Sequence, residues 1–291
     1  MSIVYLNGQF LPIEAACISP LDRGFLFGDG VYEVISVYHG KLFHAQEHLN
    51  RLNRSLDAIR LRSPFQNDQW LSLIHELLQQ NQITHQTKSI YLQITRGTDT
   101  KRDHLFPSTD TAPTIFVFLM DLHPPGYEKL QQGFKAITYP DHRWDRCHIK
   151  SILLLPNILA SQTAKDNQAT EALLIRNGYV LEGASSNVFT VKDNVIQTPP
   201  LGEFILGGVI RDIVLELAKQ NHLQIQETSI TKEALFNADE VWITSSTREI
   251  MPIIDIDHQQ IGTGKSGPLW HRMIQYFHTA INASTSKGEC L

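Results

Sequence analysis

Lys150 is the residue of this 291-residue chain whose setting points most directly to chemistry. It stands against an apolar run, in Cys147-His148-Ile149-Lys150-Ser151-Ile152-Leu153-Leu154-Leu155. Lysine is seldom buried without a partner or a function, and desolvation favours the neutral amine, a nucleophile that can form a Schiff base. The alternative is an ordinary lysine at a strand end, with its methylenes on apolar neighbours and its charge in water.

Glu182 is the second candidate, and small polar residues follow it. The run Leu181-Glu182-Gly183-Ala184-Ser185-Ser186-Asn187 leads into the apolar pair Val188-Phe189. A buried carboxylate at a strand end can pair with a protonated ring nitrogen. The alternative is a turn in which the Ser and Asn side chains satisfy backbone groups.

Three further features could hold a phosphate. Leu206-Gly207-Gly208-Val209-Ile210-Arg211 places two glycines before an amphipathic helix, whose first N–H groups can bind an anion. Thr244-Ser245-Ser246-Thr247 offers hydroxyl donors after a strand. Arg51 lies near the edge of the apolar stripe of a predicted helix, where a guanidinium can hold a phosphate as a fork. Each also has an ordinary interpretation, as a loop, a turn or a surface salt bridge.

Together these five features match the requirements of a pyridoxal phosphate site. Such a site needs a lysine that forms an imine, a carboxylate for the pyridinium nitrogen and a cup of donors for the phosphate. A non-enzymatic protein that binds a phosphate ligand would have no use for a buried lysine facing a carboxylate. The combination therefore favours an enzyme.

Motifs in a fixed order along nearly the whole chain match one enzyme family. They are Asp22-Arg23-Gly24, Phe27-Gly28-Asp29-Gly30-Val31-Tyr32-Glu33-Val34, Glu47-His48-Leu49-Asn50-Arg51-Leu52, Arg143-Trp144 with Cys147 and Ile149-Lys150-Ser151, the run from Glu182 to Phe189, Ile205-Leu206 with Gly208 and Arg211-Asp212, and Thr244-Ser245-Ser246-Thr247 with Glu249-Ile250. By these residues the chain resembles the fold-type IV pyridoxal-phosphate aminotransferases, and among them the D-amino acid transaminases most closely. The resemblance implies an α/β (α+β), two-lobed fold, with a small N-terminal α/β domain at 1–122, a linker at 123–128 and a larger C-terminal α/β pseudo-barrel domain at 129–291 that carries the cofactor lysine.

The resemblance also implies a role for each candidate. Lys150 would form a Schiff base with pyridoxal 5'-phosphate, and Glu182 would pair with the ring nitrogen. The implied cofactor-binding groups are Arg51, the backbone of Val209 and Ile210, and Ser246 at the phosphate, with Leu206 near the ring. Tyr32, Arg102 and His104 would bind the α-carboxylate of the substrate. In this family the neighbouring subunit supplies the loop with Arg102 and His104, so a homodimer is implied, and no metal is.

The implied activity is ping-pong transfer of an amino group between D-amino acids, such as D-alanine, and 2-oxo acids, such as 2-oxoglutarate and pyruvate. Arg-Asp-His at 102–104 is similar to the Arg-x-His pattern that separates D-specific enzymes from branched-chain relatives. A branched-chain L-amino acid aminotransferase and an aminodeoxychorismate-type lyase are alternatives on the same fold. Two residues depart from the family: Ile210 stands where close relatives tend to have Thr, so we expect weaker cofactor retention, and His148 replaces an acidic residue.

Hydrophobic periodicity predicts strands and helices interspersed in both halves of the chain. In the first half we expect hairpins at Ile3–Leu11 and 31–43, helices at Glu47–Leu61 and Asp68–Asn81, a half-buried strand at Ile90–Ile94 and a fully buried strand at Thr114–Met120. In the second half we expect strands at Phe134–Tyr139, Glu171–Ile175, Tyr179–Leu181, Asn187–Val191, Val195–Thr198, Gln224–Glu227 and Glu240–Thr244, and helices at Pro156–Asp166, Val209–Gln220, Lys232–Phe236 and Leu269–Ile281. The polar stretch from Thr98 to Pro113 predicts a long loop, either functional or simply solvated.

Composition excludes several other classes of protein. Hydrophobic residues make up 42% and charged residues 19%, which is globular rather than disordered. The net charge of −5, with no basic stripe, argues against nucleic-acid binding. The longest apolar run, about Ile115 to Met120, is far short of the ~20 residues that span a membrane, and the first residues indicate a strand rather than a signal peptide. Cys17, Cys147 and Cys290 are few and far apart, which fits a reducing cytoplasm.

Overall fold

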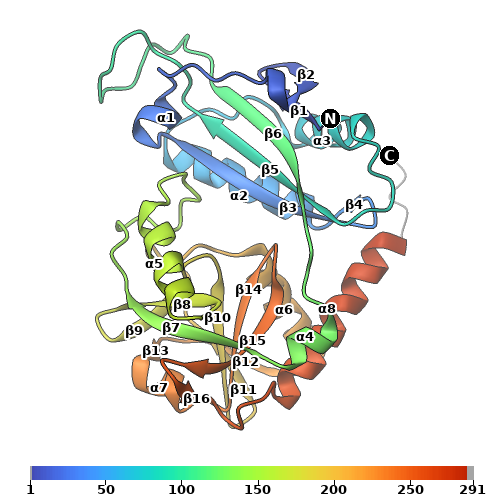
Figure 1. Cartoon of the computed structure of the whole chain (residues 1–291), viewed down its shortest axis with the longest axis vertical. Coiled ribbons are helices and arrows are strands. Elements are labelled where there is room, and N and C mark those ends of the chain that lie inside the picture. Colours follow the sequence, from blue (N-terminus) through green and yellow to red (C-terminus); the bar gives the residue numbers. More distant parts are fainter. Residues whose placement is uncertain (1, 287–291) are drawn as a thin grey trace. The chain divides into compact units, whose positions relative to one another are not determined.

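The computed structural model describes residues 2–286 and groups the chain into two compact units (Figure 1). Unit 1 runs to His123 and also includes Ile149–Leu153. Unit 2 comprises Pro124–His148 and the chain from Leu154 onward. Lys150 therefore groups with unit 1, although the residues before and after its short segment belong to unit 2. The domain limits at 1–122, 123–128 and 129–291 stay a prediction.

Unit 1 contains a six-stranded antiparallel sheet in the order β2-β1-β6-β5-β3-β4. Its strands are β1 (Ile3–Leu6), β2 (Gln9–Pro12), β3 (Gly30–Tyr38), β4 (Lys41–Leu42), β5 (Lys88–Thr95) and β6 (Thr114–Asp121). The β1–β2 hairpin is confirmed, and Asn7 and Gly8 at its turn have positive φ values of 48° and 94°, as a two-residue hairpin turn requires.

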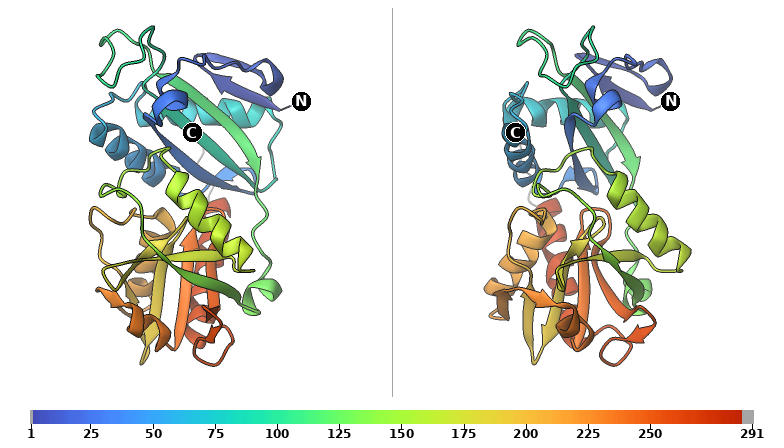
Figure 2. Two further views of the ribbon diagram at one scale, coloured as in Figure 1. Left: turned by 60° about the vertical axis from the view of Figure 1, so that its left-hand side comes forward. Right: turned by 90° about the vertical axis from the view of Figure 1, so that its left-hand side faces the viewer.

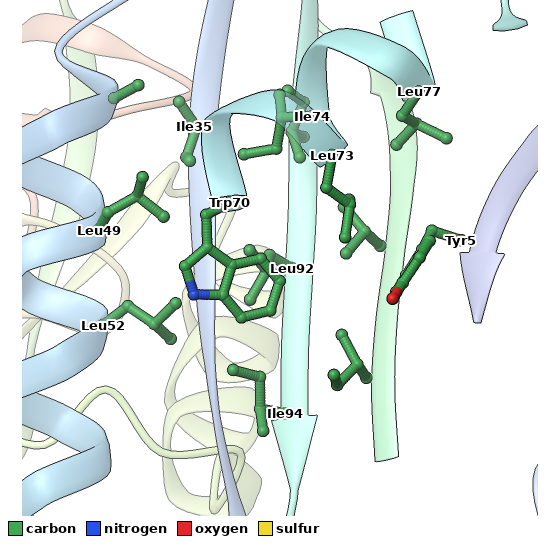
Figure 3. Close-up of a cluster of buried hydrophobic side chains, with 14 of the residues drawn as sticks. Tyr5, Ile35, Leu49, Leu52, Trp70, Leu73, Ile74, Leu77, Leu92 and Ile94 are labelled. Atoms are coloured by element: carbon green, nitrogen blue, oxygen red, sulfur yellow. The ribbon is translucent and has the colours of Figure 1, made fainter. Parts of the chain in front are cut away.

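Helices α2 (Ala45–Ala58) and α3 (Asn67–Gln80) pack on one face of this sheet through a single apolar cluster (Figure 3). Trp70 and Ile74 of α3 and Leu52 of α2 are buried in it against Leu92 of β5. The short helices η1 (Ile13–Ala15) and α1 (Arg23–Phe27) precede β3.

Two expectations for unit 1 are wrong in detail. Helix α2 ends at Ala58 rather than Leu61, because Arg60 adopts a left-handed φ of 57° that a helix cannot continue through. Strand β6 is not fully buried: its alternate residues Phe116 and Phe118 are only half-buried, because the helices cover one face of the sheet alone.

The expected long loop joins β5 to β6 and projects beyond the sheet of unit 1 (Figure 2). Its ends meet where Thr95 pairs with Thr114. They lie so close that a Cβ on Gly97, whose φ is +87°, would come within 2.0 Å of the Ala112 carbonyl oxygen. Only a glycine fits at this point of the chain.

Unit 2 is built on a ten-stranded mixed sheet that forms a half-barrel, in the order β12-β11-β10-β14-β15-β7-β8-β9-β13 with β16 paired to β15. Parallel pairs join β7 to β8, β7 to β15 and β11 to β12. The strands are β7 (Phe134–Pro140), β8 (Glu171–Arg176), β9 (Tyr179–Gly183), β10 (Asn187–Lys192), β11 (Val195–Thr198), β12 (Gln224–Glu227), β13 (Ile230–Thr231), β14 (Glu240–Ser245), β15 (Glu249–Ile256) and β16 (Gln259–Gln260).

The helices of unit 2 are α4 (Tyr127–Gln131), α5 (Leu155–Asp166), α6 (Val209–Gln220), α7 (Lys232–Phe236) and α8 (Pro268–Ser286). Small residues allow α5 to lie close to the sheet, with Ala160 and Ala164 against Ala172. The four predicted helices are confirmed. Strand β15 was not predicted, and α4 begins inside the predicted linker.

Within residues 2–286, no helix is long and apolar enough to cross a membrane. In the same part of the chain, Cys17 is exposed, Cys147 is buried, and both are free thiols. Cys290 lies outside the described residues.

Candidate active site

The backbone of Lys150 is fixed at the edge of β3 in unit 1. The Tyr32 N–H donates to the Lys150 carbonyl oxygen at 3.0 Å, and the Ile152 N–H donates to the Gly30 oxygen at 3.1 Å. From α2, the Ser55 hydroxyl oxygen accepts from the Lys150 N–H at 3.2 Å. The segment thus acts as a short extra strand on β3, and the side chain of Lys150 starts from a defined position.

The amine of Lys150 lies over the ring of Tyr32, one of the predicted carboxylate-binding residues. Its Nζ is 4.2 Å from the ring centroid, a cation–π distance. Tyr32 in turn stacks on Tyr91, with 5.6 Å between the centroids. Both Lys150 and Tyr32 are half-buried, so the amine is partly desolvated yet still reachable by a small molecule.

Arg51 is buried rather than part of a surface salt bridge, so that alternative is wrong. Its Nε and Nη2 donate to the two oxygens of Glu33 at 2.7 and 2.8 Å, and His48 Nδ1 lies 2.8 Å from the same carboxylate. Although burial raises the pKa of Glu33, Arg51 and His48 hold it well below its usual range. Burial lowers the pKa of His48 against the opposing effect of Glu33. The fork fixes the plane of the Arg51 guanidinium.

Arg102 and His104 are exposed on the loop between β5 and β6, and both contact Phe27 of α1. The Arg102 Cζ is 5.1 Å from the Phe27 ring centroid, and the His104 ring meets the same ring edge-on at 5.5 Å. No contact described within residues 2–286 joins Tyr32 to either of them. The three predicted carboxylate-binding side chains are therefore not assembled by contacts inside one chain.

In unit 2, Glu182 lies at the end of β9 and is 4% exposed. Its carboxylate forms an ion pair with Arg143 and accepts from the Leu206 N–H at 3.1 Å. Burial raises the pKa of Glu182 to about 7, against the opposing effects of Arg143 and the Leu206 N–H. Asn187 Nδ2 lies 3.4 Å from the Glu182 carboxylate and donates to the Leu206 carbonyl at 2.8 Å. The structure thus brings Glu182 and Leu206 together.

The groups of unit 2 that are predicted to bind the phosphate lie at the start of α6 and on the turn after β14. Gly208 is the N-cap of α6 and provides no side-chain cap for the first N–H groups, at Val209 and Ile210. A Cβ on Gly208 would lie 2.0 Å from Asn187 Oδ1, so the close approach of backbone and amide needs a glycine. Ser246 follows β14, half-buried.

The turn that carries Ser246 is held to the turn after Glu182 by Arg248. The Arg248 guanidinium donates to Glu171 at 2.6 Å and to the Ser185 hydroxyl at 2.5 Å. The Ser186 hydroxyl donates to the same Glu171 carboxylate at 2.8 Å. Thr244, just before this turn, has a buried hydroxyl with no hydrogen-bond partner within the part of the chain that the structure describes.

The groups that each unit provides match separate parts of pyridoxal phosphate. Unit 2 provides a buried carboxylate for a ring nitrogen, a helix start whose N–H groups have no side-chain cap, and the orphaned Thr244 hydroxyl beside a Ser turn. Unit 1 provides a half-buried amine and an oriented arginine. Across residues 2–286, no group of three or more His, Cys, Asp or Glu side chains has the geometry to hold a metal ion.

Sequence reasoning missed the partners that orient the candidates. These partners act through buried or half-buried ion pairs. Glu33 orients Arg51, Arg143 orients Glu182, and Arg248, paired with Glu171, holds the turn that carries Ser246. Glu33 had a usable signal, because alternation along β3 places it on the same face as the buried Val31 and Ile35.

Comparison with known proteins identifies the family. Residues 30–256 match amino-transferase class IV. The D-alanine aminotransferase of Staphylococcus haemolyticus is 39% identical over 98% of this chain and 100% of its own length, and that of Bacillus licheniformis is 41% identical over 98% and 99%. Among solved structures, the Escherichia coli branched-chain amino acid aminotransferase has a TM-score of 0.89 at 25% identity, covering 99% of this chain and 97% of that one. The branched-chain amino acid aminotransferase of Thermoproteus uzoniensis, solved with norvaline, has a TM-score of 0.84 at 26% identity, with 99% and 95% covered. This chain belongs to the class IV aminotransferases, the fold-type IV enzymes that its motifs resemble.

Proposed function

We propose that the chain is a pyridoxal-phosphate-dependent transaminase that moves the amino group between D-amino acids, such as D-alanine, and 2-oxo acids, such as 2-oxoglutarate and pyruvate. The observation that carries this is the similarity to D-alanine aminotransferases, 39–41% identical over almost all of both chains. The branched-chain enzymes share the fold at only 25–26% identity. The polar pair Arg102 and His104 also favours the D-specific branch.

The residues described above would hold the cofactor as follows. Lys150 would bind it covalently, Glu182 would accept from its ring nitrogen, and Leu206 would pack near the ring. Its phosphate would take hydrogen bonds from Arg51, from the N–H groups of Val209 and Ile210, and from Ser246. When bound, pyridoxal phosphate supplies an aldehyde that forms a Schiff base with an amine and a ring that accepts electrons from the α-carbon of the substrate.

Lys150 and Glu182 would divide the proton chemistry between them. The Lys150 Nζ, partly desolvated over Tyr32, can take and return the α-proton of the substrate. Glu182 would hold a proton at the ring nitrogen by charge pairing. Because Lys150 can reach only one face of the substrate, the position of the α-carboxylate decides which enantiomer presents its hydrogen to that face. Tyr32, Arg102 and His104 are the groups that would set this position.

We also propose a homodimer in which the loop of one chain completes the site of the other. Leu155, Ile158 and Leu159 support it: they occupy one face of α5 and are 55–67% exposed, which is unusual for large apolar side chains unless another surface covers them. The absence of any contact between Tyr32 and Arg102 or His104 inside residues 2–286 agrees with a partner-supplied loop. A cytoplasmic location stays a prediction from the cysteine content, to be checked by cell fractionation.

The substrate assignment can be tested by comparing D- and L-alanine with 2-oxoglutarate as acceptor. Wild type should use D-alanine well and L-alanine poorly. Arg102→Ala removes a charged hydrogen bond worth about 1.5–3 kcal/mol, so KM for D-alanine should rise roughly 10- to 150-fold and the D/L preference should shrink. Lys101→Ala, next to it on the loop, is the control. Preference for L-substrates would favour the branched-chain alternative, and pyruvate release without an acceptor would favour the lyase.

The role of Lys150 can be tested by spectroscopy and turnover together. Lys150→Ala should bind pyridoxal phosphate only non-covalently, so borohydride should fix no cofactor to the chain. Turnover should fall by several decades, because the amine that moves the proton is gone. Lys135→Ala, an exposed lysine on β7, should behave as wild type. Near-normal transamination by Lys150→Ala would contradict the assignment.

Mixing Arg102→Ala, which is expected to be weak at low D-alanine concentration, with Lys150→Ala, which is expected to lose turnover, tests where the loop acts. Hybrid dimers of Arg102→Ala and Lys150→Ala chains would contain one site with an intact Lys150 and an intact Arg102 from the partner. After random exchange, about one quarter of wild-type activity should return at low D-alanine concentration, since half of the dimers carry one good site of two. If the loop serves its own chain, mixing restores nothing, because no site then has both residues.

The raised pKa of Glu182 predicts a stability change in the cofactor-free protein. Burial holds this pKa at about 7 rather than 4.5, so the folded chain keeps a proton that the unfolded chain has already lost, and this group's contribution to stability falls as the pH rises through that window. Glu182→Gln does not titrate. Between about pH 5 and about pH 8, the free energy of unfolding of wild type should therefore fall relative to that of Glu182→Gln by up to about 3 kcal/mol. Urea unfolding measures this difference. The exposed Glu203→Gln should show no such trend relative to wild type.

A further inference from the structure

The base of the loop between β5 and β6 is held by one buried carboxylate. Asp22 Oδ2 accepts from the hydroxyls of Thr95 and Thr114 at 2.8 and 2.6 Å, the residues at the two ends of the flanking strands. Asp22 also forms an isolated bridge with Thr98. Its other oxygen accepts from the Gly24 N–H at 2.8 Å. Both ends of the loop are therefore tied to the start of α1.

The middle of the loop is held by the next residue, Arg23, which is 4% exposed. Its Nη1 donates to the carbonyl oxygen of Asp103 at 2.8 Å, and Asp103 lies between Arg102 and His104. Its Nε donates to Asp29 at 2.9 Å. Because Asp29 also accepts from Arg96 Nε at 2.9 Å, Arg23 is itself fixed in place.

Phe27, on the same short helix, contacts both functional side chains of the loop. Besides Arg102 at 5.1 Å and His104 at 5.5 Å, its ring centroid lies 4.9 Å from the Cζ of Arg23. Aromatic rings attract cations over their faces and meet other rings edge-on. The loop is thus restrained by Asp22 at its base, by Arg23 at its backbone and by Phe27 at its side chains. Phe106, farther along the loop, also contacts Arg96, with 3.9 Å between its ring centroid and the Arg96 Cζ.

We propose that Arg23 and Phe27 are positioning residues that hold Arg102 and His104 in the orientation needed to bind the substrate carboxylate. The inference rests on the proposed function, since it gives the loop its ligand. A recognition site works only when its groups are held close to the productive geometry. Exposed side chains on a 16-residue loop, 98–113, would lose that geometry without such restraints.

Phe27→Leu tests the proposal, with Phe65→Leu as its matched control. Both rings are half-buried in unit 1, and Phe65 packs edge-on against Trp70 at 4.9 Å, away from the loop. For Phe27→Leu, KM for D-alanine should rise about 3- to 30-fold, with kcat within about twofold and the cofactor spectrum unchanged. The D/L ratio should fall. Phe65→Leu should lose comparable thermal stability and keep both KM and the ratio.

A second measurement does not depend on activity. Hydrogen–deuterium exchange across 98–113 should be faster in Phe27→Leu and in Arg23→Lys than in wild type and Phe65→Leu. Arg23→Lys keeps a positive charge beside Asp29 but loses the guanidinium that donates to both Asp29 and the Asp103 carbonyl. Unchanged exchange in both variants would overturn the proposal whatever the activity. Faster exchange with unchanged KM and D/L ratio would overturn it too, because the loop would then be held for another reason. A wild type that does not use D-alanine contradicts the proposed function instead, while the exchange data still show whether Phe27 and Arg23 hold the loop.

Discussion

The open edge of β3 is the constraint on which the proposed chemistry of unit 1 depends. A lysine side chain has several rotatable bonds, so its amine has a defined reach only if the backbone beneath it cannot move. Hydrogen bonds from Tyr32 and to Gly30 and Ser55 supply that fixed point. The fit is close, since a Cβ on Gly30 would lie 2.6 Å from the Ile94 carbonyl oxygen. Gly30 thus lets β3 lie close to β5, and its Cβ position would also be 3.1 Å from the side chain of Ile152, two residues after Lys150.

Buried ion pairs then orient the other proposed cofactor-binding groups. Arg51 is held by Glu33, and Glu182 by Arg143, all of them nearly inaccessible to solvent. Burying both charges costs desolvation that their attraction offsets only in good geometry, and removing one partner typically costs about 3–5 kcal/mol. Such pairs contribute little net stability. What each pair provides is a side chain whose orientation within its own unit is fixed before any ligand arrives, which lowers the entropy lost on binding.

The sequence predicted the elements better than the pairs between them. Helix α6 has the predicted bounds, because a glycine pair and an unbroken 3.6-residue pattern mark it. Strand β15 escaped prediction because Pro252 interrupts an otherwise apolar stretch, and α1 has only five residues. The pairing of Arg143 with Glu182 spans 39 positions, and no local pattern encodes which distant charge a carboxylate will meet. Resemblance to a family could name Lys150 and Glu182, but not the side chains that aim them.

The loop residues proposed for carboxylate recognition and the amine proposed for proton transfer have different supports within unit 1. Lys150 and Tyr32 are fixed by the edge of β3, whereas Arg102 and His104 rest on α1 through Arg23 and Phe27. A change in the loop or in α1 can therefore alter how a carboxylate is held without moving the amine. This separation gives a physical reason why chains that superimpose with a TM-score of 0.89 at 25% identity need not share a substrate enantiomer. Under the proposed roles, the common fold would fix the proton-transfer groups, and the loop, held by Arg23 and Phe27, would be free to set which enantiomer of the substrate binds.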